Sequence, residues 1–310
     1  MLRPKIRRNS GKNAAPAIPV SLKKGRISMA KCSVCFRHCD IPDGKLGFCG
    51  GRTARDGVTE ACNYGRVTAL ALDPIEKKPL ARFYPGSRIL SVGSFGCNLR
   101  CPFCQNYDIS WSEQARKYAE TAETVSPETL VDIALETRAR GNIGIAFTYN
   151  EPLIGYEFVR DTAKLAQEAG LKNVMVTNGT AELAILRELA PYIDAMNIDL
   201  KGFSDRYYTD VLGGSRKMVL AFIEEAVKTS HVELTTLIVP GENDTEDEMR
   251  ELSRWVSRLR NPDGEAVPLH ISRFFPRFHM QDRDATNVRT VYRLADVARE
   301  NLPYVYTGNC

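Results

Sequence analysis

The chain has 310 residues, of which 43% are hydrophobic and 26% charged, a composition typical of globular proteins. Its apolar runs are short and interrupted by charges or prolines, which excludes a membrane-spanning helix. Its start lacks the apolar core of a signal peptide, so we expect a cytoplasmic protein with no membrane partner. The formal net charge of +4 is uneven: residues 1–31 hold nine Lys and Arg and no Asp or Glu, which leaves a net −5 for residues 32–310.

Residues 1–30 form the basic N-terminal stretch, which includes "NSGKNAAPAIPVS". Small, polar and proline residues of this kind predict a disordered tail. Only this tail could bind nucleic acid, because the rest of the chain is mildly acidic, so we do not expect a nucleic-acid partner. A second interpretation is an extended or misassigned start, with Met29 as the initiator.

A Cys-rich module is expected next, over residues 31–65. Its cysteines form a C-x2-C-x3-C-x9-C array: Cys32, Cys35, Cys39 and Cys49. Four thiolates can close one tetrahedral zinc site, which is the plain interpretation. An auxiliary iron–sulfur cluster, acting as an electron relay or a substrate anchor, is the alternative. His38 could replace one thiolate in either site.

Short β-rich runs then alternate with helix-patterned stretches through residues 66–310. The strand candidates are residues 88–94, 143–149, 172–178, 194–200, 231–239 and 268–275. Between two of them, residues 126–141 open with Ser126 as a helix N-cap and Pro127 at the first helical position, and end at Gly141. Six strand–helix repeats imply an α/β fold with parallel strands and right-handed crossovers. The periodicity alone does not distinguish a doubly wound sheet from a barrel.

Polar or Gly/Pro-rich clusters follow several of these strands: "TYNEP", "TNGT", "DLKG", "VPGEND" and "RFFP". In a barrel, the chemistry lies on the loops after the carboxyl ends of the strands. A cysteine-rich loop follows the first strand in the same way. The sequence therefore predicts one site at which these loops converge.

That loop, "SVGSFGCNLRCPFCQNYDIS", contains Cys97, Cys101 and Cys104. Thiolates are soft ligands that select zinc or iron–sulfur clusters, and a structural zinc site needs four protein ligands. A four-iron cluster held by three thiolates instead leaves one iron free to bind a substrate or cofactor. Gly96 permits a tight entry into the loop, and Phe103 is placed to shield the cluster or stack on an aromatic ligand. The alternative is a zinc knuckle completed by a distant Cys or His.

This C-x3-C-x2-C pattern, with an aromatic residue before the third cysteine, resembles the signature of the radical S-adenosylmethionine (SAM) enzymes. Further stretches resemble the group related to pyruvate formate-lyase activating enzyme: "DPIEKKPLARFYPGS", "TYNEPLIGYEF", "TNGT", "NIDLKGF" and "HISRFFPR". Within that group the chain is most similar to the AmmeMemoRadiSam-system radical SAM enzymes. The resemblance covers roughly residues 30–310. The extra cysteines precede the barrel, unlike the ferredoxin-like insert of glycyl radical activases, which puts a plain activase assignment in doubt.

The resemblance implies a partial (β/α)6 radical SAM barrel over residues 66–310, preceded by the small N-terminal Cys-rich module. It implies that Cys97, Cys101 and Cys104 hold a [4Fe–4S] cluster whose open iron chelates the amino and carboxylate groups of SAM. A reduced cluster would then split the sulfonium, and a 5′-deoxyadenosyl radical would abstract hydrogen from the substrate. We expect reduced flavodoxin or ferredoxin as the electron donor.

The same resemblance suggests roles for side chains on the other loops. Glu151 stands where the family holds the SAM ammonium with a polar strand end, and a carboxylate suits a cation. Asn178 is expected either to reach the ribose or carboxylate of SAM or to cap the following helix. Asp199 and Lys201 resemble an Asp-x-Lys element near the SAM carboxylate and ribose. His270 faces the same cavity if strand alternation holds. Each assignment has a structural alternative: Glu151 is a surface acid, Asp199 and Lys201 form a structural salt bridge, and His270 is packed without a role in the site.

We therefore expect an oxidoreductase that cleaves SAM reductively and abstracts hydrogen. The leading interpretation is modification of a protein or peptide, as in glycyl radical activases. The alternatives are functionalisation of a small molecule or nucleotide, and a non-catalytic interaction module in which both cysteine groups bind metal structurally.

Overall fold

The computed structural model of the chain describes residues 28–310, so the predictions for residues 1–27 lie outside the described residues. A single eight-stranded sheet organises the molecule, in the spatial order β14-β13-β12-β11-β10-β9-β7-β6. Its strands are β6 (Ala69–Pro74), β7 (Arg88–Gly93), β9 (Asn142–Phe147), β10 (Lys172–Thr177), β11 (Ala195–Asp199), β12 (His231–Ile238), β13 (Leu269–Arg273) and β14 (Val305–Gly308). All neighbouring pairs are parallel except β6 and β7.

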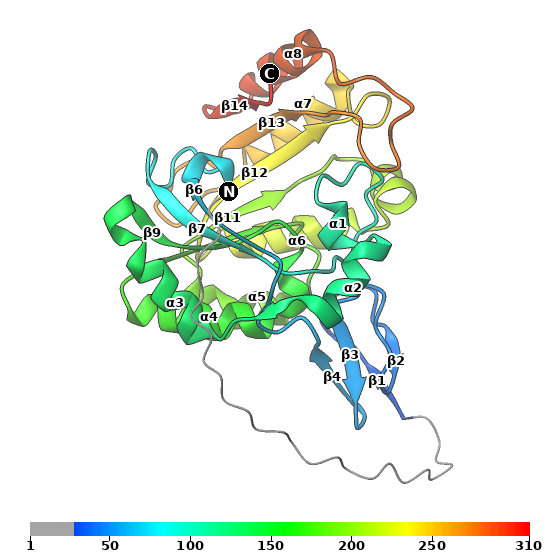
Figure 1. Ribbon diagram of the computed structural model, residues 1–310. Helices are drawn as coiled ribbons and strands as arrows, with labels where there is room; N and C mark the ends of the chain where they lie inside the picture. The colour runs from blue at the N-terminus through cyan, green and yellow to red at the C-terminus, as the bar shows by residue number, and fades with distance from the viewer. Residues whose placement is uncertain (1–27) are drawn as a thin grey trace, which may run out of the picture.

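Helices connect these strands, with α3, α4 and α5 along one flank of the sheet and α7 and α8 at its other end (Figure 1). They are α1 (Tyr107–Ser110), α2 (Glu113–Thr121), α3 (Pro127–Glu136), α4 (Tyr156–Glu168), α5 (Leu183–Leu189), α6 (Arg216–Ala226), α7 (Glu246–Val256) and α8 (Val288–Arg299). The α4 helix forms because its apolar residues recur at helical spacing, so that Phe158, Val159 and Ala163 share the buried face.

The predicted six parallel strands are confirmed as β7 and β9 to β13, each within a few residues of its expected range. Two edge strands were missed. The β6 strand adds antiparallel to β7, and β14 adds parallel to β13. Both are only partly buried, so neither has the continuous apolar pattern of the central strands.

The helix expected over residues 126–141 starts as predicted, because the Ser126 hydroxyl accepts a hydrogen bond from the amide of Thr129. It ends earlier, at Glu136. The Thr137 hydroxyl donates to the carbonyls of Ile133 and Ala134, and a single 3-10 turn over Arg138–Arg140 follows. Gly141 then reverses the chain in the left-handed conformation, with φ +85°.

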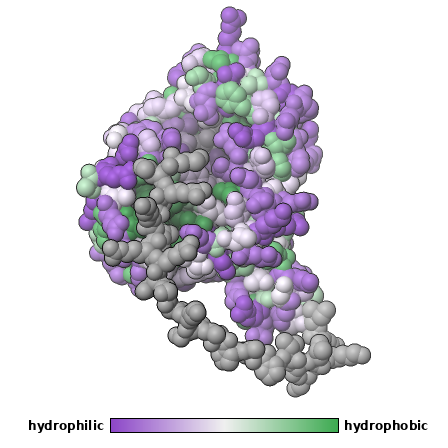
Figure 2. Space-filling model, in the orientation of Figure 1, coloured by the Kyte–Doolittle hydropathy of each residue, from purple (hydrophilic) through white to green (hydrophobic). Residues whose placement is uncertain are grey.

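Four short strands before the large sheet form two separate hairpins: β1 (Met29–Lys31) with β2 (Asp40–Pro42), and β3 (Arg52–Arg55) with β4 (Val58–Ala61). They project from the molecule beside α2 (Figure 1) and present a mainly hydrophilic surface (Figure 2). The β1 strand begins at Met29, two residues before the position at which we expected the Cys-rich module to open. A third pairing, of β5 (Arg66–Val67) with β8 (Glu123–Thr124), joins the start of the sheet to the region before α3.

Residues 75–83, which we call the floor segment, leave β6 at one edge of the sheet and reach β12 near the other. The side chain of Leu80 is fully buried among Ala146, Val174 and Ala195, which lie on three different central strands. The amides of Ala81 and Arg82 donate to the Glu233 carboxylate on β12 at 2.9 and 2.7 Å. The floor segment therefore covers the interior face of the central strands and fills the space inside the barrel. In residues 28–310, none of the helices is both long and apolar enough for a membrane span.

Candidate functional site

The carboxyl ends of the parallel strands open into a cavity of about 680 Å³, within the size range of small-molecule sites. Every residue predicted for the radical site lines it: Cys97, Cys101, Phe103, Cys104, Glu151, Asn178, Asp199, Lys201 and His270. They come from the loops after β7, β9, β10 and β11 and from β13. The structure thus brings the cysteine loop together with "TYNEP", "TNGT" and "DLKG". No residue of "VPGEND" or "RFFP" lines this cavity, so the predicted convergence is wrong for these two loops.

The cysteine loop leaves β7 in a tight turn. Gly96 has a φ of +93°, and a Cβ atom there would lie 2.7 Å from the carbonyl oxygen of Cys49. The side-chain amide of Asn150 donates to the carbonyls of Phe95 and Gly96 at 3.2 Å. The loop therefore needs glycine at this position for its conformation and for its close approach to the Cys-rich module.

Of the three loop cysteines, Cys101 is buried and Cys97 and Cys104 are partly buried. Burial raises the pKa of Cys101 to about 12 and raises the pKa values of Cys97 and Cys104 as well, so without metal these groups are neutral thiols. The amide of Leu99 donates to the sulfur of Cys97 at 3.4 Å. Metal coordination deprotonates a thiol, and this amide then stabilises the negative charge.

This donor set fits a cluster better than a single ion. Within residues 28–310, no three Cys, His, Asp or Glu side chains converge closely enough to ligate one metal ion. A four-iron cluster spreads its thiolate ligands further apart than one ion does. Three soft ligands on one wall of a large cavity, with no fourth cysteine among the described residues that line it, therefore suit a cluster with one open iron.

Glu151, on the loop after β9, is buried rather than exposed on the surface, so the surface-acid alternative is wrong. One carboxylate oxygen accepts the Thr177 hydroxyl at 2.6 Å and the Leu153 amide at 3.1 Å, and the other accepts the Asn178 amide at 2.8 Å. Burial raises the pKa of Glu151 to about 7 in spite of these donors. The carboxylate borders the cavity in a setting that favours a cationic partner.

Asn178 does not cap the following helix, because α5 begins at Leu183 with Glu182 at its N-cap. Its side-chain oxygen accepts the amide of Thr180 at 3.0 Å. Its side-chain nitrogen donates to Asn98 Oδ1 at 3.0 Å and lies 3.7 Å from the sulfur of Cys97. Asn178 therefore contacts the cysteine loop directly.

Asp199 and Lys201 form an ion pair of 2.9 Å at the end of β11, and both line the cavity. Burial opposes the charge of Lys201, but Asp199 and the neighbouring Cys101 raise its pKa well above the ordinary value. Lys201 is thus a fixed cation beside the cysteine loop. The expected salt bridge exists, and it lies in the wall of the cavity rather than away from it.

Phe103, on the cysteine loop, and His270, on β13, both line the cavity. Phe103 packs edge-on against Phe274 with 6.1 Å between ring centroids. His270 Nε2 lies 2.6 Å from a Glu233 oxygen, and its ring stacks on Tyr306 of β14. Glu233 was missed by the sequence analysis. Its signal was a lone acid within the alternating strand "HVELTTLIV".

The floor segment also contributes to the cavity wall, which the sequence analysis did not assign. Glu76, Lys77, Pro79 and Ala81 line it. Behind them, Asp73 accepts hydrogen bonds from Lys78 at 2.9 Å and from the Tyr149 hydroxyl at 2.7 Å. Burial alone would raise the pKa of Asp73, but these donors lower it to about 2. The motif "DPIEKKPLARFYPGS" thus supplies one side of the site.

The four cysteines of the Cys-rich module lie around a second, buried cavity: Cys32, Cys35, Cys39 and Cys49. His38 is not among its lining residues. Its Nε2 lies 3.3 Å from a Glu182 oxygen instead. The structure therefore gives no support to His38 as a replacement ligand.

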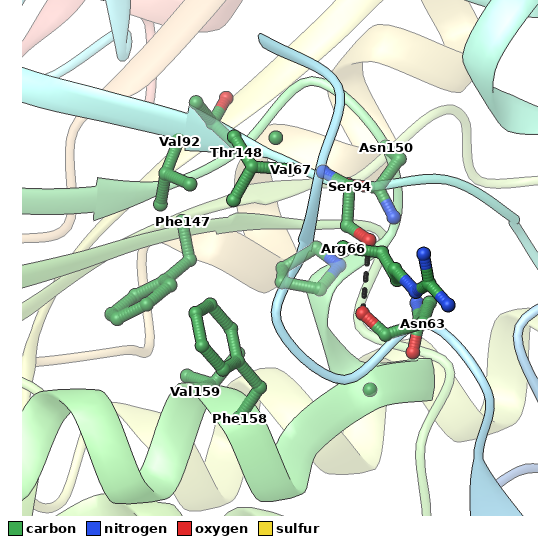
Figure 3. Close-up of a pocket in the computed structure, with 13 residues that line it drawn as sticks. Asn63, Arg66, Val67, Val92, Ser94, Phe147, Thr148, Asn150, Phe158 and Val159 are labelled. Atoms are coloured by element: carbon green, nitrogen blue, oxygen red, sulfur yellow. Dashed lines mark hydrogen bonds between the residues drawn. The ribbon is translucent and has the colours of Figure 1, made fainter. Parts of the chain in front are cut away.

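A separate cavity of about 30 Å³ lies between β7, β9 and α4 (Figure 3). Apolar side chains such as Val92, Phe147 and Phe158 fill most of its wall, and Ser94 donates to the carbonyl of Asn63 at 3.3 Å (Figure 3). None of the nine cysteines lines it. The Asn63 side chain also donates to the carbonyl of Phe95 at 3.0 Å, so this region supports the start of the cysteine loop.

Comparisons with known proteins agree with this geometry. Residues 91–256 match the family model of the Radical SAM superfamily. The uncharacterized protein MJ0808 of Methanocaldococcus jannaschii is 41% identical over 282 residues, which cover 90% of this chain and 81% of the relative. The pyruvate formate-lyase 1-activating enzyme of Escherichia coli K12 is 27% identical over 190 residues, 60% of this chain and 75% of that enzyme. The crystal structure of Streptococcus suis SuiB bound to S-adenosylmethionine has a similar fold, with a TM-score of 0.53 and 11% identity over 69% of this chain and 48% of SuiB.

Proposed function

Because the chain belongs to the Radical SAM superfamily, whose members use a [4Fe–4S] cluster and SAM, we propose that it cleaves SAM reductively to modify a protein or peptide. The observation that carries the proposal is the cavity of about 680 Å³ with three thiols on one wall. The facing walls offer a buried carboxylate, an amide and a fixed ammonium group. These are the groups that a zwitterionic cofactor requires.

Cys97, Cys101 and Cys104 would hold the cluster. When bound and reduced, it supplies the electron that breaks the sulfonium C–S bond of SAM and so generates a carbon radical for hydrogen abstraction. The amide of Leu99 stabilises the thiolate of Cys97. Asn178 limits the position of Cys97 through its contact with the sulfur.

The remaining polar groups bind and orient SAM in this proposal. The Lys201 ammonium pairs with the carboxylate of the methionine part, while Asp199 fixes Lys201 and stays available to a ribose hydroxyl. The Glu151 carboxylate, already held by three donors, accepts the ammonium of SAM. Phe103 and Leu237, which also line the cavity, exclude water from the reacting centre.

A protein or peptide substrate is supported by the similarity to the activating enzyme of pyruvate formate-lyase. Reduction of the cluster requires a one-electron donor, and we assign this role to reduced flavodoxin or ferredoxin. All nine cysteines are free thiols, which suits the reducing cytoplasm as the location.

The first experiment tests the chemistry. The anaerobically reconstituted protein, given dithionite and SAM, should release methionine and 5′-deoxyadenosine. The Cys101→Ala variant should lose both cluster and cleavage, while Cys62→Ala, a thiol outside the proposed ligand sets, should retain them. Equal cleavage by the two variants would contradict the assignment of the cluster to this loop.

The second experiment tests the substrate class. The reconstituted enzyme is incubated with a fully deuterated cell extract that has been separated into macromolecules and small molecules. Deuterium should enter 5′-deoxyadenosine only with the macromolecular fraction, and protease treatment of that fraction should abolish the transfer. Label transferred solely from the small molecules would refute a protein substrate and leave the radical chemistry in place.

A further inference from the structure

The four cysteines of the Cys-rich module are arranged around one point of the molecule, next to the cysteine loop of the proposed active site. We infer that Cys32, Cys35, Cys39 and Cys49 hold a second iron–sulfur cluster, which passes electrons to the first. The relay role rests on the proposed function, whereas the presence of the second cluster does not.

The backbone of the two hairpins places the thiols. The amide of Cys32 donates to the carbonyl of Cys39 at 2.8 Å, which joins two of them at the base of β1 and β2. Cys49 lies in the turn before β3. All four thiols border the same buried cavity together with apolar residues such as Ile41 and Ile154. The module has few other buried side chains, so bound metal would supply much of its core.

The spacing favours a cluster over zinc. A zinc ion holds its sulfurs at about 2.3 Å, a shell too tight to admit a water molecule. Here the four thiols border a buried cavity of about 10 Å³ together with six other residues. No three of the side chains described in residues 28–310 converge on a single ion position. The thiols therefore stand further apart than one ion would hold them, as the ligands of a cluster do.

The second site touches the first directly. The amide of Cys97 donates to the carbonyl of Cys49 at 3.0 Å, so one hydrogen bond links a ligand of each proposed cluster. Arg37 from the module and Arg100 from the cysteine loop lie 3.4 and 3.7 Å from the ring centre of Phe48. Arg37 also donates to the carbonyl of Asn98 at 2.8 Å. The joint between the two sites is therefore built from fixed contacts.

Four thiolates leave no iron open, so the second cluster has no position at which a substrate could bind. Its chemistry is limited to electron transfer. One electron moves from the reduced second cluster to the first, and the external protein donor, reduced flavodoxin or ferredoxin, returns one electron to the second. No bond forms or breaks in this step.

Metal analysis of the full chain tests the composition. After anaerobic reconstitution, iron and sulfide per chain should exceed the content of one [4Fe–4S] cluster, and zinc should be absent. The double variant Cys35→Ala/Cys49→Ala should fall to the content of one cluster, whereas Cys62→Ala should match the native sequence. One zinc per chain, or no metal beyond the first cluster, would overturn the inference.

A complementary variant covers the case in which the double variant fails to fold. The triple variant Cys97→Ala/Cys101→Ala/Cys104→Ala leaves the second site intact. It should retain iron and sulfide, and its reduced electron paramagnetic resonance spectrum should not change when SAM is added. A triple variant without iron would refute the second cluster.

The electron path has its own readout. With dithionite, which can reduce the first cluster directly, the double variant should still cleave SAM. With reduced ferredoxin as the only donor, it should lose cleavage that Cys62→Ala retains. Equal loss with both reductants would refute the relay, and absence of cleavage in the native sequence would instead count against the proposed function.

Discussion

At the scale of single residues, Gly96 shows how little freedom the cysteine loop has. Its φ of +93° disfavours any other residue, and a Cβ atom would lie 2.7 Å from Cys49 O and 2.8 Å from Ile154 Cδ1. Two separate costs therefore meet at one position: the left-handed backbone and the contact with the Cys-rich module. A suitable control separates them.

We expect Gly96→Ala to lower both the iron content after reconstitution and the melting temperature, because the loop must move away from Cys49. Gly264→Ala is the control, since Gly264 has φ +84° and a Cβ atom added there would meet no other atom within 4 Å. It should show only the backbone strain, on the order of 1–2 kcal/mol. Similar effects of the two variants on iron content would rule out the contact as the cause.

Glu233 is the second residue whose role depends on its neighbours. Its side chain is fully buried in β12, and its oxygens meet four donors: the amides of Ala81 and Arg82 and the rings of His231 and His270. Burial alone would raise the pKa of Glu233, but these donors lower it from 4.5 to about 2. The folded state therefore favours the carboxylate form.

This shift predicts a pH dependence of stability. A lowered folded pKa gives stabilisation that is complete above the unfolded value near 4.5 and is lost as the pH falls toward 2. The size is about 3 kcal/mol. Denaturant unfolding of the metal-free protein at several pH values should show a stability difference between native sequence and Glu233→Gln that shrinks below pH 4.5. A difference independent of pH would contradict the lowered pKa.

At the scale of elements, the floor segment links the edge strand β6 to β11 and β12 across the interior of the sheet. Its Leu80 side chain fills the interior between Ala146, Val174 and Ala195. Asn197 of β11 donates to the carbonyl of Pro79 at 2.8 Å, and Glu233 of β12 holds the next two amides. The segment therefore carries both the packing of the barrel floor and part of the cavity wall.

Leu80→Ala should destabilise the protein by about 2–5 kcal/mol, because it leaves a void among strands that cannot easily collapse. Leu46→Ala, at a side chain that is 44% exposed, should change the stability little. Denaturant unfolding measures both. A small effect of Leu80→Ala would mean that the floor segment is not part of the cooperative core.

Some features of the helices and strands follow from the local sequence pattern, and others do not. Ser126 and Pro127 mark the start of α3 correctly, because capping involves only neighbouring amides. The end of α3 was placed too late, since the Thr137 hydroxyl competes for the last carbonyls. The β14 strand was missed because its pairing with β13, rather than any alternation of its own, makes it a strand.

At the scale of the whole molecule, the Cys-rich module contacts the barrel through the hydrogen bond between the Cys97 amide and the Cys49 carbonyl. SAM that binds to the cluster-loaded protein should stabilise this entire unit by mass action. At a SAM concentration 100 times the Kd, the gain is about 2.7 kcal/mol. Thermal unfolding under anaerobic conditions should show it in the reconstituted native sequence and not in Cys101→Ala. Equal stabilisation of both would mean that SAM binds without the cluster.

The order of residues was sufficient to predict the strand–helix alternation, the positions of the strand ends and the cysteine spacings. These depend on residues close together in the chain, whose period and capping follow from local geometry. For the same reason most residues of the radical site could be predicted: they lie at or just after the carboxyl ends of parallel strands, which meet at one edge of the sheet. His270 lies inside β13 and was placed by strand alternation. The nine predicted side chains do line one cavity, although their contacts with cluster and cofactor stay predictions.

Other features became visible only in three dimensions: how the floor segment reaches Glu233, how His270 acquires its carboxylate partner, and how Cys49 meets Cys97. Ala81 and Glu233 are 152 positions apart, and Cys49 and Cys97 belong to different modules. Such contacts arise from packing and from the need to pair buried polar groups, and neither leaves a periodic trace in the sequence. Chain-distant hydrogen bonds of this kind are set by the complete fold, because only the complete fold removes these groups from water.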